Sequence, residues 1–482
     1  MMNSLPIPVS RLLTERKLPL FLGGAASALA TLVVTAHWSL AVFGGFAVFA
    51  LSVAAKESFL LAVLFLLPVE WLLKTDFLIH DVMTAGRVLV AAGFFTGRLC
   101  RGPISVRRLI RPACSWWSLL FGAAALLSVA LGTEGWSHNS ARSLALLASS
   151  LLFYFFLLEW ADSRDRIRRI LMVLLCSAMV TAVFAVVQEI AGGYTSFWLL
   201  LNPPTEELAD WDRRATSFLN YPNSLAAYLN LLLPLAVACC FRGEGGWKRL
   251  GAWTAGFGFL GMVCTQSRGG MVALGCVLVL AIFCFVAAWP RRVVLLGALA
   301  GAVWALYLVG ASVNPERLSE GVGASSGGRL ILWGVAWELF RNSRVFGVGM
   351  GNFTGMYGSY LDVSWIRPGF LTVNNLYLEI LSEIGIVGFV AFSGLTVSGM
   401  RCALRHFRSS TDGLGQCLSF GVLGALSTIV VHGAVDLTLD VSPQFDTLLW
   451  VMLGLLAADM ALQYGSSIET SCPEGRPVPA GA

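Results

Sequence analysis

Charged residues are scarce in this chain, and their scarcity excludes a soluble protein. Asp, Glu, Lys and Arg make up 13% of the 482 residues, whereas hydrophobic residues make up 57%. A typical soluble domain carries about 25% charged residues. The mean hydropathy of +0.74 agrees with this conclusion. We predict an all-α polytopic membrane protein, because a helix satisfies its own backbone hydrogen bonds in lipid.

The chain contains few residues of the kinds that usually bind metals, with 11 cysteines and 5 histidines. The 11 cysteines are scattered, mostly inside apolar runs, and form no CxxC pair. We interpret them as small buried hydrophobic residues rather than as disulfides or metal ligands. No metal, no cofactor and no nucleic-acid partner is expected. A short basic segment at the N-terminus runs directly into the first apolar run, so no cleavable signal is expected either.

Apolar runs long enough to cross a bilayer follow one another along the chain. A transmembrane helix needs roughly 20 mostly apolar residues, and we predict about 12–14 such helices. The candidate spans are residues 18–36, 38–55, 57–73, 82–97, 114–132, 143–160, 170–191, 223–241, 250–266, 269–289, 293–311, 376–399, 418–435 and 445–463. We divide the chain into an N-terminal transmembrane bundle (1–200), a second transmembrane region (201–463) that contains a large loop (312–375), and a disordered tail (464–482).

Lys and Arg set the orientation of these spans, because they accumulate in cytoplasmic loops. If the N-terminus is cytoplasmic and the spans alternate, 22 of the 33 basic residues lie on the cytoplasmic side. Both termini are therefore expected in the cytoplasm, with the long segments 192–222 and 312–375 on the outer side. In the second segment, RLILWGVAWELFRN has apolar residues at helical spacing, which predicts a helix near the outer interface.

Three arginines on the predicted outer side are the main functional signal. Arg214 lies in RRATSFLNYPN, Arg268 in TQSRGG and Arg329 in SSGGRLILWG. A guanidinium group is planar, always charged and matches phosphate oxygens, so three of them on one face would form a clamp for pyrophosphate. The alternative is that each arginine only anchors a helix end at the interface.

Two further arginines are candidates for the same ligand. Arg213 adjoins Arg214 and shares or takes its role in one interpretation. Arg87 lies inside the predicted span 82–97, where a charged residue is costly and usually functional. It is either a fourth phosphate contact or the partner of a neighbouring acid.

From about residue 200 to 460 the chain resembles the bacterial O-antigen ligase and O-antigen polymerase superfamily. Four segments carry the resemblance, in the order and on the side expected. They are RATSFLNYPNSLAAYLNLLLPLA (214–236), TQSRGG (265–270), GRLILWGVAWELFRNSRVFGVGMGNF (328–353) and NNLYLEILSEIGIVG (374–388). Residues 1–200 are similar to the family only in their hydrophobic profile.

The resemblance implies a metal-independent glycosyltransferase with a membrane fold of the C type, in the bacterial inner membrane. Its donor would be a glycan on undecaprenyl pyrophosphate, transferred to a sugar hydroxyl on the periplasmic face in O-antigen or exopolysaccharide polymerisation or ligation. The acceptor would be a second glycan in a polymerase or lipid A-core in a ligase, and other polysaccharide-assembly proteins are possible partners. Many family members have His-Asn where this chain has Asn374 and Asn375. That histidine has been assigned a catalytic role, so the difference leaves the proton acceptor open and favours a polymerase.

The remaining candidates surround this position. Glu379 and Glu383, four residues apart on one helix face, are each either a general base or a partner that holds an arginine. Asn374, Asn375 and Tyr377 are candidate contacts to donor or acceptor. His432 and Asp436, also four apart, form either an oriented pair at the substrate or a structural hydrogen bond between helices.

A transporter or flippase of lipid-linked oligosaccharide is the alternative function. Such a protein would show ionisable residues at the middle of its spans and an internal repeat. The sequence shows one arginine within a span, no convincing repeat and a long, structured outer loop. A scaffold for an envelope-synthesis complex would leave the three arginines without a purpose. The glycosyltransferase is therefore the favoured hypothesis.

Overall fold

A computed structural model describes residues 57–68, 77–100, 109, 112–191, 214–219, 221–313, 323–356, 360, 372–435 and 443–471. Within these ranges the chain is helical and contains no strand. The helices are α4 (Glu57–Phe65), α5 (Phe77–Cys100), α7 (Ala113–Leu131), α8 (His138–Trp160), α9 (Arg164–Ile190), α11 (Pro222–Arg242), α12 (Gly246–Thr265), α13 (Arg268–Phe285), α14 (Trp289–Val313), α16 (Gly323–Asn342), α17 (Phe353–Met356), α18 (Leu376–Ser409), α19 (Gly413–His432) and α20 (Pro443–Ser471). The prediction of an all-α membrane protein is confirmed.

Seven of the described helices are long and apolar enough to cross a membrane: α7, α8, α9, α11, α13, α18 and α19. The predicted spans 18–36 and 38–55 lie outside the described residues. A continuous span over 57–73 is wrong, because α4 ends at Phe65. Pro68 follows shortly after, and proline disfavours helical conformation in the residue before it.

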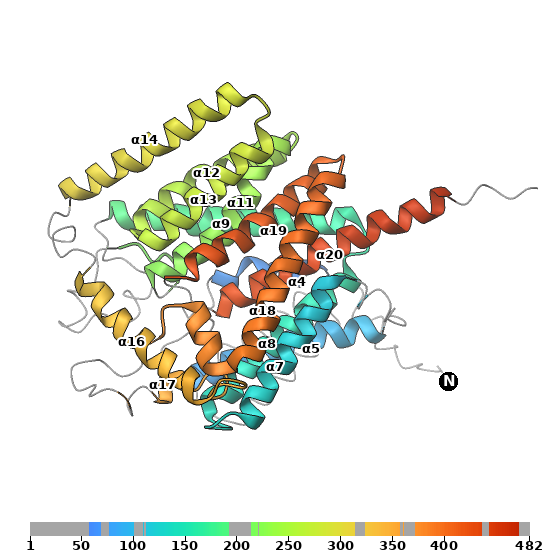
Figure 1. The fold of residues 1–482 in the computed structure, drawn as a ribbon. Coiled ribbons are helices and arrows are strands. Elements are labelled where there is room, and N and C mark those ends of the chain that lie inside the picture. Colours follow the sequence, from blue (N-terminus) through green and yellow to red (C-terminus); the bar gives the residue numbers. More distant parts are fainter. Residues whose placement is uncertain are drawn as a thin grey trace, which may run out of the picture.

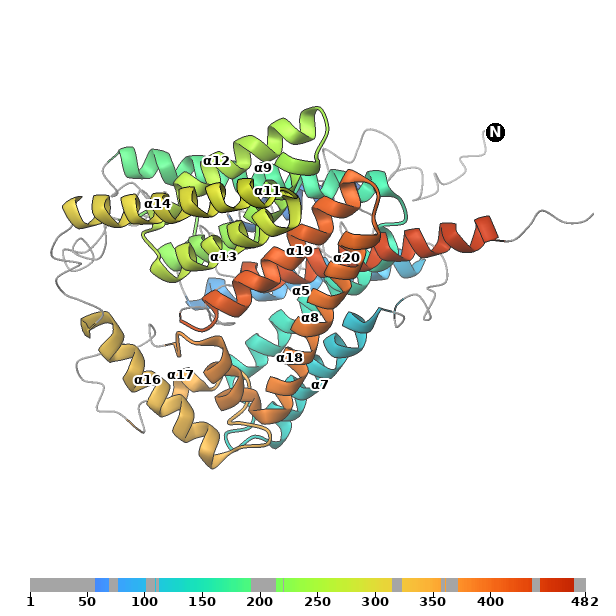
Figure 2. The same ribbon diagram turned by 45° about the horizontal axis from the view of Figure 1, so that its top comes forward.

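One continuous apolar core joins the two groups of helices that Figure 1 shows. Helices α9, α11, α12 and α13 form one group, and α7, α8 and α18 form the other, with α19 and α20 between them (Figures 1 and 2). Helix α11 is the most enclosed span, with 83% of its apolar window buried, against 28% for α13. Glycine permits its close approach to α19, because Gly424 lies against the ring of Pro234.

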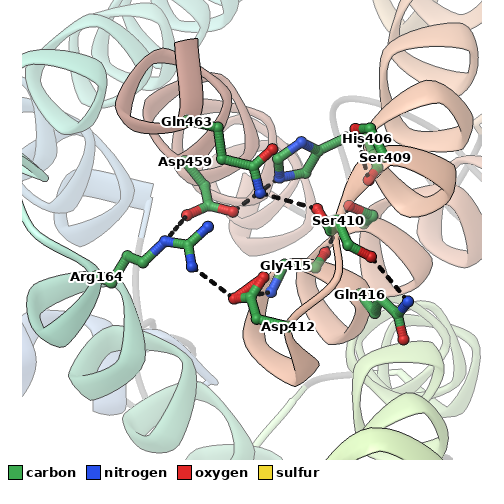
Figure 3. A network of polar contacts seen from close by, with 10 residues as sticks. Arg164, His406, Ser409, Ser410, Asp412, Gly415, Gln416, Asp459 and Gln463 are labelled. Carbon is green, nitrogen blue, oxygen red and sulfur yellow. Dashed lines mark hydrogen bonds and ion pairs between the residues drawn. The ribbon is translucent and has the colours of Figure 1, made fainter. Parts of the chain in front are cut away.

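A buried polar network ties four helices together at one end of the bundle (Figure 3). Asp459 on α20 is fully buried; its carboxylate lies 2.7 Å from His406 Nε2 on α18 and 3.4 Å from Arg164 Nε on α9. A second nitrogen of Arg164 lies 2.7 Å from Asp412, the N-cap residue of α19. A buried charge of this kind is expensive unless it is paired, so the network fixes how the four helix ends meet.

The first turns of α18 are separated from the rest of the helix by a break at Gly385, where φ is 72°. The break removes helical hydrogen bonds, and the segment after α16 replaces them. Val348 and Gly349 donate their N–H groups to the carbonyls of Ser382 and Glu383, both at 2.9 Å. In return, the N–H of Ile386 donates to the Arg344 carbonyl at 2.9 Å. A broken helix is tolerated in a membrane protein where such neighbours satisfy its backbone.

Glycine is required in both segments that share these backbone hydrogen bonds. A Cβ atom on Gly347 would lie 2.4 Å from the Glu383 backbone, and one on Gly385 would lie 2.2 Å from the Val345 carbonyl oxygen. Gly347, Gly349 and Gly351 all have positive φ. The Gly-x-Gly-x-Gly segment is thus a tightly packed backbone junction, because only glycine combines that conformation with so little space.

Helix α16 packs against this junction and confirms the helix predicted in RLILWGVAWELFRN. Its buried face forms a second, smaller apolar core with the junction and the residues before α18: Leu332, Val335, Ala336, Leu339, Val348, Phe353 and Val373. Its other face leaves large apolar side chains exposed, with Leu330 61% and Trp337 49% exposed. An apolar exposed face on a helix with a buried opposite face is typical of contact with lipid.

Candidate active site

The three predicted arginines lie on segments that meet at the end of the bundle opposite the network of Figure 3. This end contains the first turns of α11, α13 and α18, the start of α16 and the last turn of α19. Contacts between these segments run without interruption from Arg214 to Arg329, as described below. The structure therefore brings the trio into one neighbourhood, while their functional roles stay a prediction.

Arg214 is held by the turn between α12 and α13. Its Nε donates to the Thr265 carbonyl at 2.7 Å, and Nη2 donates to Asn223 Oδ1 at 2.8 Å. The turn itself needs a left-handed residue, Gln266, with φ of 50°. Arg214 therefore fixes the start of α11 to the end of α12, in addition to any contact with a ligand. Neither partner was identified from the sequence, although Asn223 stands in the same quoted motif.

Arg268 is differently placed, at the first position of α13. Its side chain is exposed and, among the described residues, has no hydrogen bond or ion pair. Ser267 caps the helix by accepting the N–H of Gly270 at 3.3 Å. The guanidinium thus stands beside the positive end of the helix dipole, where an anion is favoured.

Arg329 reaches the same place from α16. Its Nη1 donates to the Val435 carbonyl at 2.8 Å, just beyond the end of α19. A Cβ on Gly269 would lie 2.8 Å from Val435 Cγ2, so Val435 touches the first turn of α13. Through Val435, Arg329 is linked to the turn that carries Arg268.

Asn374, Asn375 and Tyr377 are engaged largely with the protein itself. Asn374 adopts the left-handed conformation, with φ of 51°, and its Nδ2 donates to the Thr372 carbonyl at 3.0 Å. Asn375 caps α18 by accepting the N–H groups of Tyr377 and Leu378, both at 3.1 Å. The hydroxyl of Tyr377 donates to the Val430 carbonyl at 2.7 Å.

Contacts from Asn375 and its neighbour seat the first half of α18 on the end of α19. Asn375 Nδ2 donates to the Ala434 carbonyl at 2.9 Å, and the N–H of Leu376 donates to the Gly433 carbonyl at 2.8 Å. The residues around Asn374 therefore lie next to the end of α19, which carries His432.

The two glutamates of α18 differ in their surroundings. Glu383 is 4% exposed, and its two oxygens accept the N–H groups of Gly351 at 2.8 Å and Phe353 at 2.9 Å. This geometry favours a role in holding the junction. Glu379 is 3% exposed and also interacts with other parts of the chain. The sequence contained no direct signal that Glu383 and the glycine motif would meet.

Asn352, which sequence reasoning missed, secures the junction to the other helix group. Its Nδ2 donates to the carbonyls of Gly135 and Val348, both at 3.1 Å, and its Oδ1 accepts the Ser137 hydroxyl. Its place directly after Gly-x-Gly-x-Gly was the available clue. The junction is thereby tied to the connection between α7 and α8.

His432 ends α19 and is 2% exposed. Neither ring nitrogen has a hydrogen-bond partner in the part of the chain that the structure describes. A Cβ on Gly269 would lie 3.1 Å from His432 Cδ2 and 3.5 Å from Nε2. The ring therefore lies against the first turn of α13, directly after Arg268.

Three predicted residues are not located in detail. Arg213 and Asp436 lie outside the described residues, so the pairing of Asp436 with His432 stays a prediction. Arg87 lies on α5, and its side chain is likewise outside the description. Among the residues that were searched, no group of three or more His, Cys, Asp or Glu side chains is placed to hold a metal ion.

Comparison with known proteins adds an independent observation. Residues 253–393 match a family model described as O-antigen ligase. The matched range contains Arg268, Arg329, Asn374 and Glu383, whereas Arg214 and His432 lie outside it. No curated protein matches the chain. The match over residues 253–393 supports the resemblance of this part of the chain to the O-antigen ligase and polymerase superfamily.

Proposed function

We propose that this enzyme transfers a glycan from undecaprenyl pyrophosphate to a sugar hydroxyl on the periplasmic face of the inner membrane. The family supports a ligase or polymerase activity in general. Donor, acceptor and sidedness are our inference from the site. The observation that carries it is the exposed guanidinium of Arg268, which has no partner among the described residues and lies within the matched region at a helix N-terminus.

The arginines would act on the leaving group. As the bond from the sugar to pyrophosphate breaks, negative charge grows on the lipid pyrophosphate. Guanidinium groups already in place stabilise that charge without reorganisation, which is often the largest single contribution to catalysis. Arg268 would bind phosphate oxygens directly. Arg329, which donates one N–H group to Val435, would approach from α16.

The distribution of basic residues supports the periplasmic assignment. The end of the bundle opposite the arginine site carries most of the other described basic side chains: Arg98, Arg164, Arg166, Arg168, Arg169, Arg242, Lys248, Arg249, Arg401, Arg405 and Arg408. Basic residues accumulate on the cytoplasmic side of membrane proteins. The arginine site then faces the periplasm, where ATP is absent and the pyrophosphate has to arrive on a lipid.

The test is substitution of Arg268 in a strain that lacks the gene. Arg268→Ala is expected to lower glycan transfer by about 100- to 1,000-fold, the usual effect of removing one charge-stabilising donor. Arg341→Ala is the matched control, because that exposed arginine pairs with Glu338 on the same helix at 3.1 Å. Immunoblots of membranes check that both proteins are inserted.

The readout is the surface polysaccharide. Loss of long chains with one repeat still attached would identify a polymerase, and loss of all attached glycan with accumulation of lipid-linked polymer would identify a ligase. Normal polysaccharide in the Arg268→Ala strain would reject the proposed site.

A further inference from the structure

Transfer to a hydroxyl group releases a proton, and the arginines cannot accept it. A guanidinium stays charged at all accessible pH values and has no acceptor atom. On α18 and α19, the described groups at this end of the bundle that are able to take up a proton are the carboxylates of Glu379 and Glu383 and the imidazole of His432. Their contacts distinguish them.

Both carboxylate oxygens of Glu383 already accept backbone N–H groups, from Gly351 and Phe353. Protonation would remove at least one acceptor from that junction. Glu379 is buried in the first half of α18 and interacts with other residues of the chain. His432 alone of the three has two buried polar atoms without a hydrogen-bond partner in the described part of the chain.

An unpartnered buried polar group is costly and calls for an explanation. An apolar residue would suit this position, because Leu376 and Val435 pack around this end of α19. A ligand that supplies the missing hydrogen bond would explain why it is there. The ring lies beside the turn that begins with Arg268, and the guanidinium of Arg329 is close enough to interact with it electrostatically.

Gly269 lets the first turn of α13 lie directly against the ring. A Cβ atom at this position would lie 3.1 Å from Cδ2 and 3.5 Å from Nε2 of His432, and 2.8 Å from Val435 Cγ2. Only glycine therefore allows this close approach, which places the edge of the ring next to the turn that carries Arg268.

We propose that His432 is the general base of the transfer reaction, an assignment that rests on the proposed function. The acceptor hydroxyl oxygen forms a bond to the anomeric carbon of the donor sugar, and the bond from that carbon to the pyrophosphate oxygen breaks. Its electron pair leaves with the lipid pyrophosphate, which the arginines hold. The hydroxyl proton passes to a ring nitrogen of His432, and from there to water after the products separate.

The experiment compares transfer with donor binding in the purified full-length protein. Undecaprenyl pyrophosphate is the binding probe, and lipid-linked glycan extracted from the deletion strain is the transfer substrate. His432→Gln keeps size and polarity but cannot take up a proton. We expect transfer to fall at least about 100-fold, because general bases contribute about 100- to 10,000-fold. Binding of undecaprenyl pyrophosphate should change less than about threefold.

Three results from the His432 and Glu379 variants would overturn the assignment while leaving the proposed function in place. Transfer by the His432→Gln protein within threefold of wild type would exclude a base. Parallel loss of binding and transfer would assign His432 to the donor instead. Loss of transfer with intact binding in Glu379→Gln, but not in His432→Gln, would make Glu379 the base. A wild-type protein that binds the probe but transfers nothing would reject the proposed function and this inference with it.

A pair of glycine variants decides the matter if His432→Gln does not fold. Gly269→Ala places a methyl group against the ring and Val435, whereas Gly275→Ala, on the same helix, meets no atom within 4 Å. We expect Gly269→Ala to lose transfer and Gly275→Ala to keep it. Equal transfer by both would show that the placement of the His432 ring against this turn does not matter for transfer, and would overturn the proposal.

Discussion

Replacement of Glu383 by glutamine tests whether this carboxylate holds the junction or takes part in catalysis. The carboxylate accepts two N–H groups, at 2.8 and 2.9 Å, and is 4% exposed. A glutamine has one oxygen and one NH₂ group at its end. If its oxygen accepts one N–H, its NH₂ group faces the other, so one bond is lost and a donor is left buried.

The expected cost follows from those contacts. A hydrogen bond to a charged group contributes about 1.5–3 kcal/mol, and an unsatisfied buried donor costs about 1–3 kcal/mol. Since the two contributions overlap, we expect Glu383→Gln to destabilise the protein by about 2–4 kcal/mol. Glu338→Gln is the control, because Glu338 is an exposed partner of Arg341 and such pairs contribute under about 1 kcal/mol.

Thermal unfolding of the detergent-solubilised proteins at one scan rate measures the difference, and hydrogen exchange at residues 347–353 locates it. Glu383→Gln should unfold at a clearly lower temperature than Glu338→Gln and exchange faster in the junction. A Glu383→Gln protein as stable as the control, yet inactive in transfer, would refute a holding role. It would return Glu383 to the candidates for the base.

Two further predictions concern position 374 and metals. Asn374→His should insert and fold, because asparagine and histidine are both among the residues that tolerate the left-handed conformation seen there (φ of 51°); a loss of stability greater than about 1 kcal/mol in thermal unfolding would contradict this. Treatment with EDTA should leave transfer by the purified protein unchanged, because arginines would supply the positive charge; activity that vanishes and returns with Mg²⁺ would contradict the mechanism.

Helix positions were the most predictable part of the fold, because apolar runs of membrane-spanning length are a strong and local signal. The predicted spans 114–132, 143–160, 170–191 and 223–241 correspond closely to α7, α8, α9 and α11. The prediction of one helix over 57–73 was wrong because the apolar run continues through Leu66 and Leu67, whereas α4 ends at Phe65, shortly before Pro68. The helical spacing of apolar residues also predicted α16, which has one buried and one exposed face.

The break in α18 was less predictable, because it depends on a partner that is distant in sequence. A glycine in an apolar helix is ordinary in membrane proteins, so Gly385 carried no signal by itself. It becomes a break only because the segment after α16 supplies the hydrogen bonds that the helix gives up. The spacing of Glu379 and Glu383 predicted that the two carboxylates share one helix face near the outer boundary. The contacts of Glu383 with Gly351 and Phe353 were not predictable, because these partners are also distant in sequence.

The sequence presented Arg214, Arg268 and Arg329 as equals, and the structure distinguishes them. Arg214 uses two of its donors on Thr265 and Asn223, and Arg329 uses one on Val435, so both help to build the site. Arg268 is the exposed member without a partner among the described residues. An anionic ligand is therefore expected to bind first through Arg268.

The broken helix α18 offers a second possible site for an anion, but its N-terminal N–H groups are already used. In membrane proteins with interrupted helices, an anionic group often binds at the N-terminus of a half-helix. In α18 those donors are already used, since Asn375 accepts two N–H groups and the Gly433 carbonyl accepts a third. At α13, Ser267 caps only Gly270, which leaves the N–H groups of Arg268 and Gly269 without a partner in the described residues. We therefore expect an anionic ligand to bind at the start of α13 rather than at the start of α18.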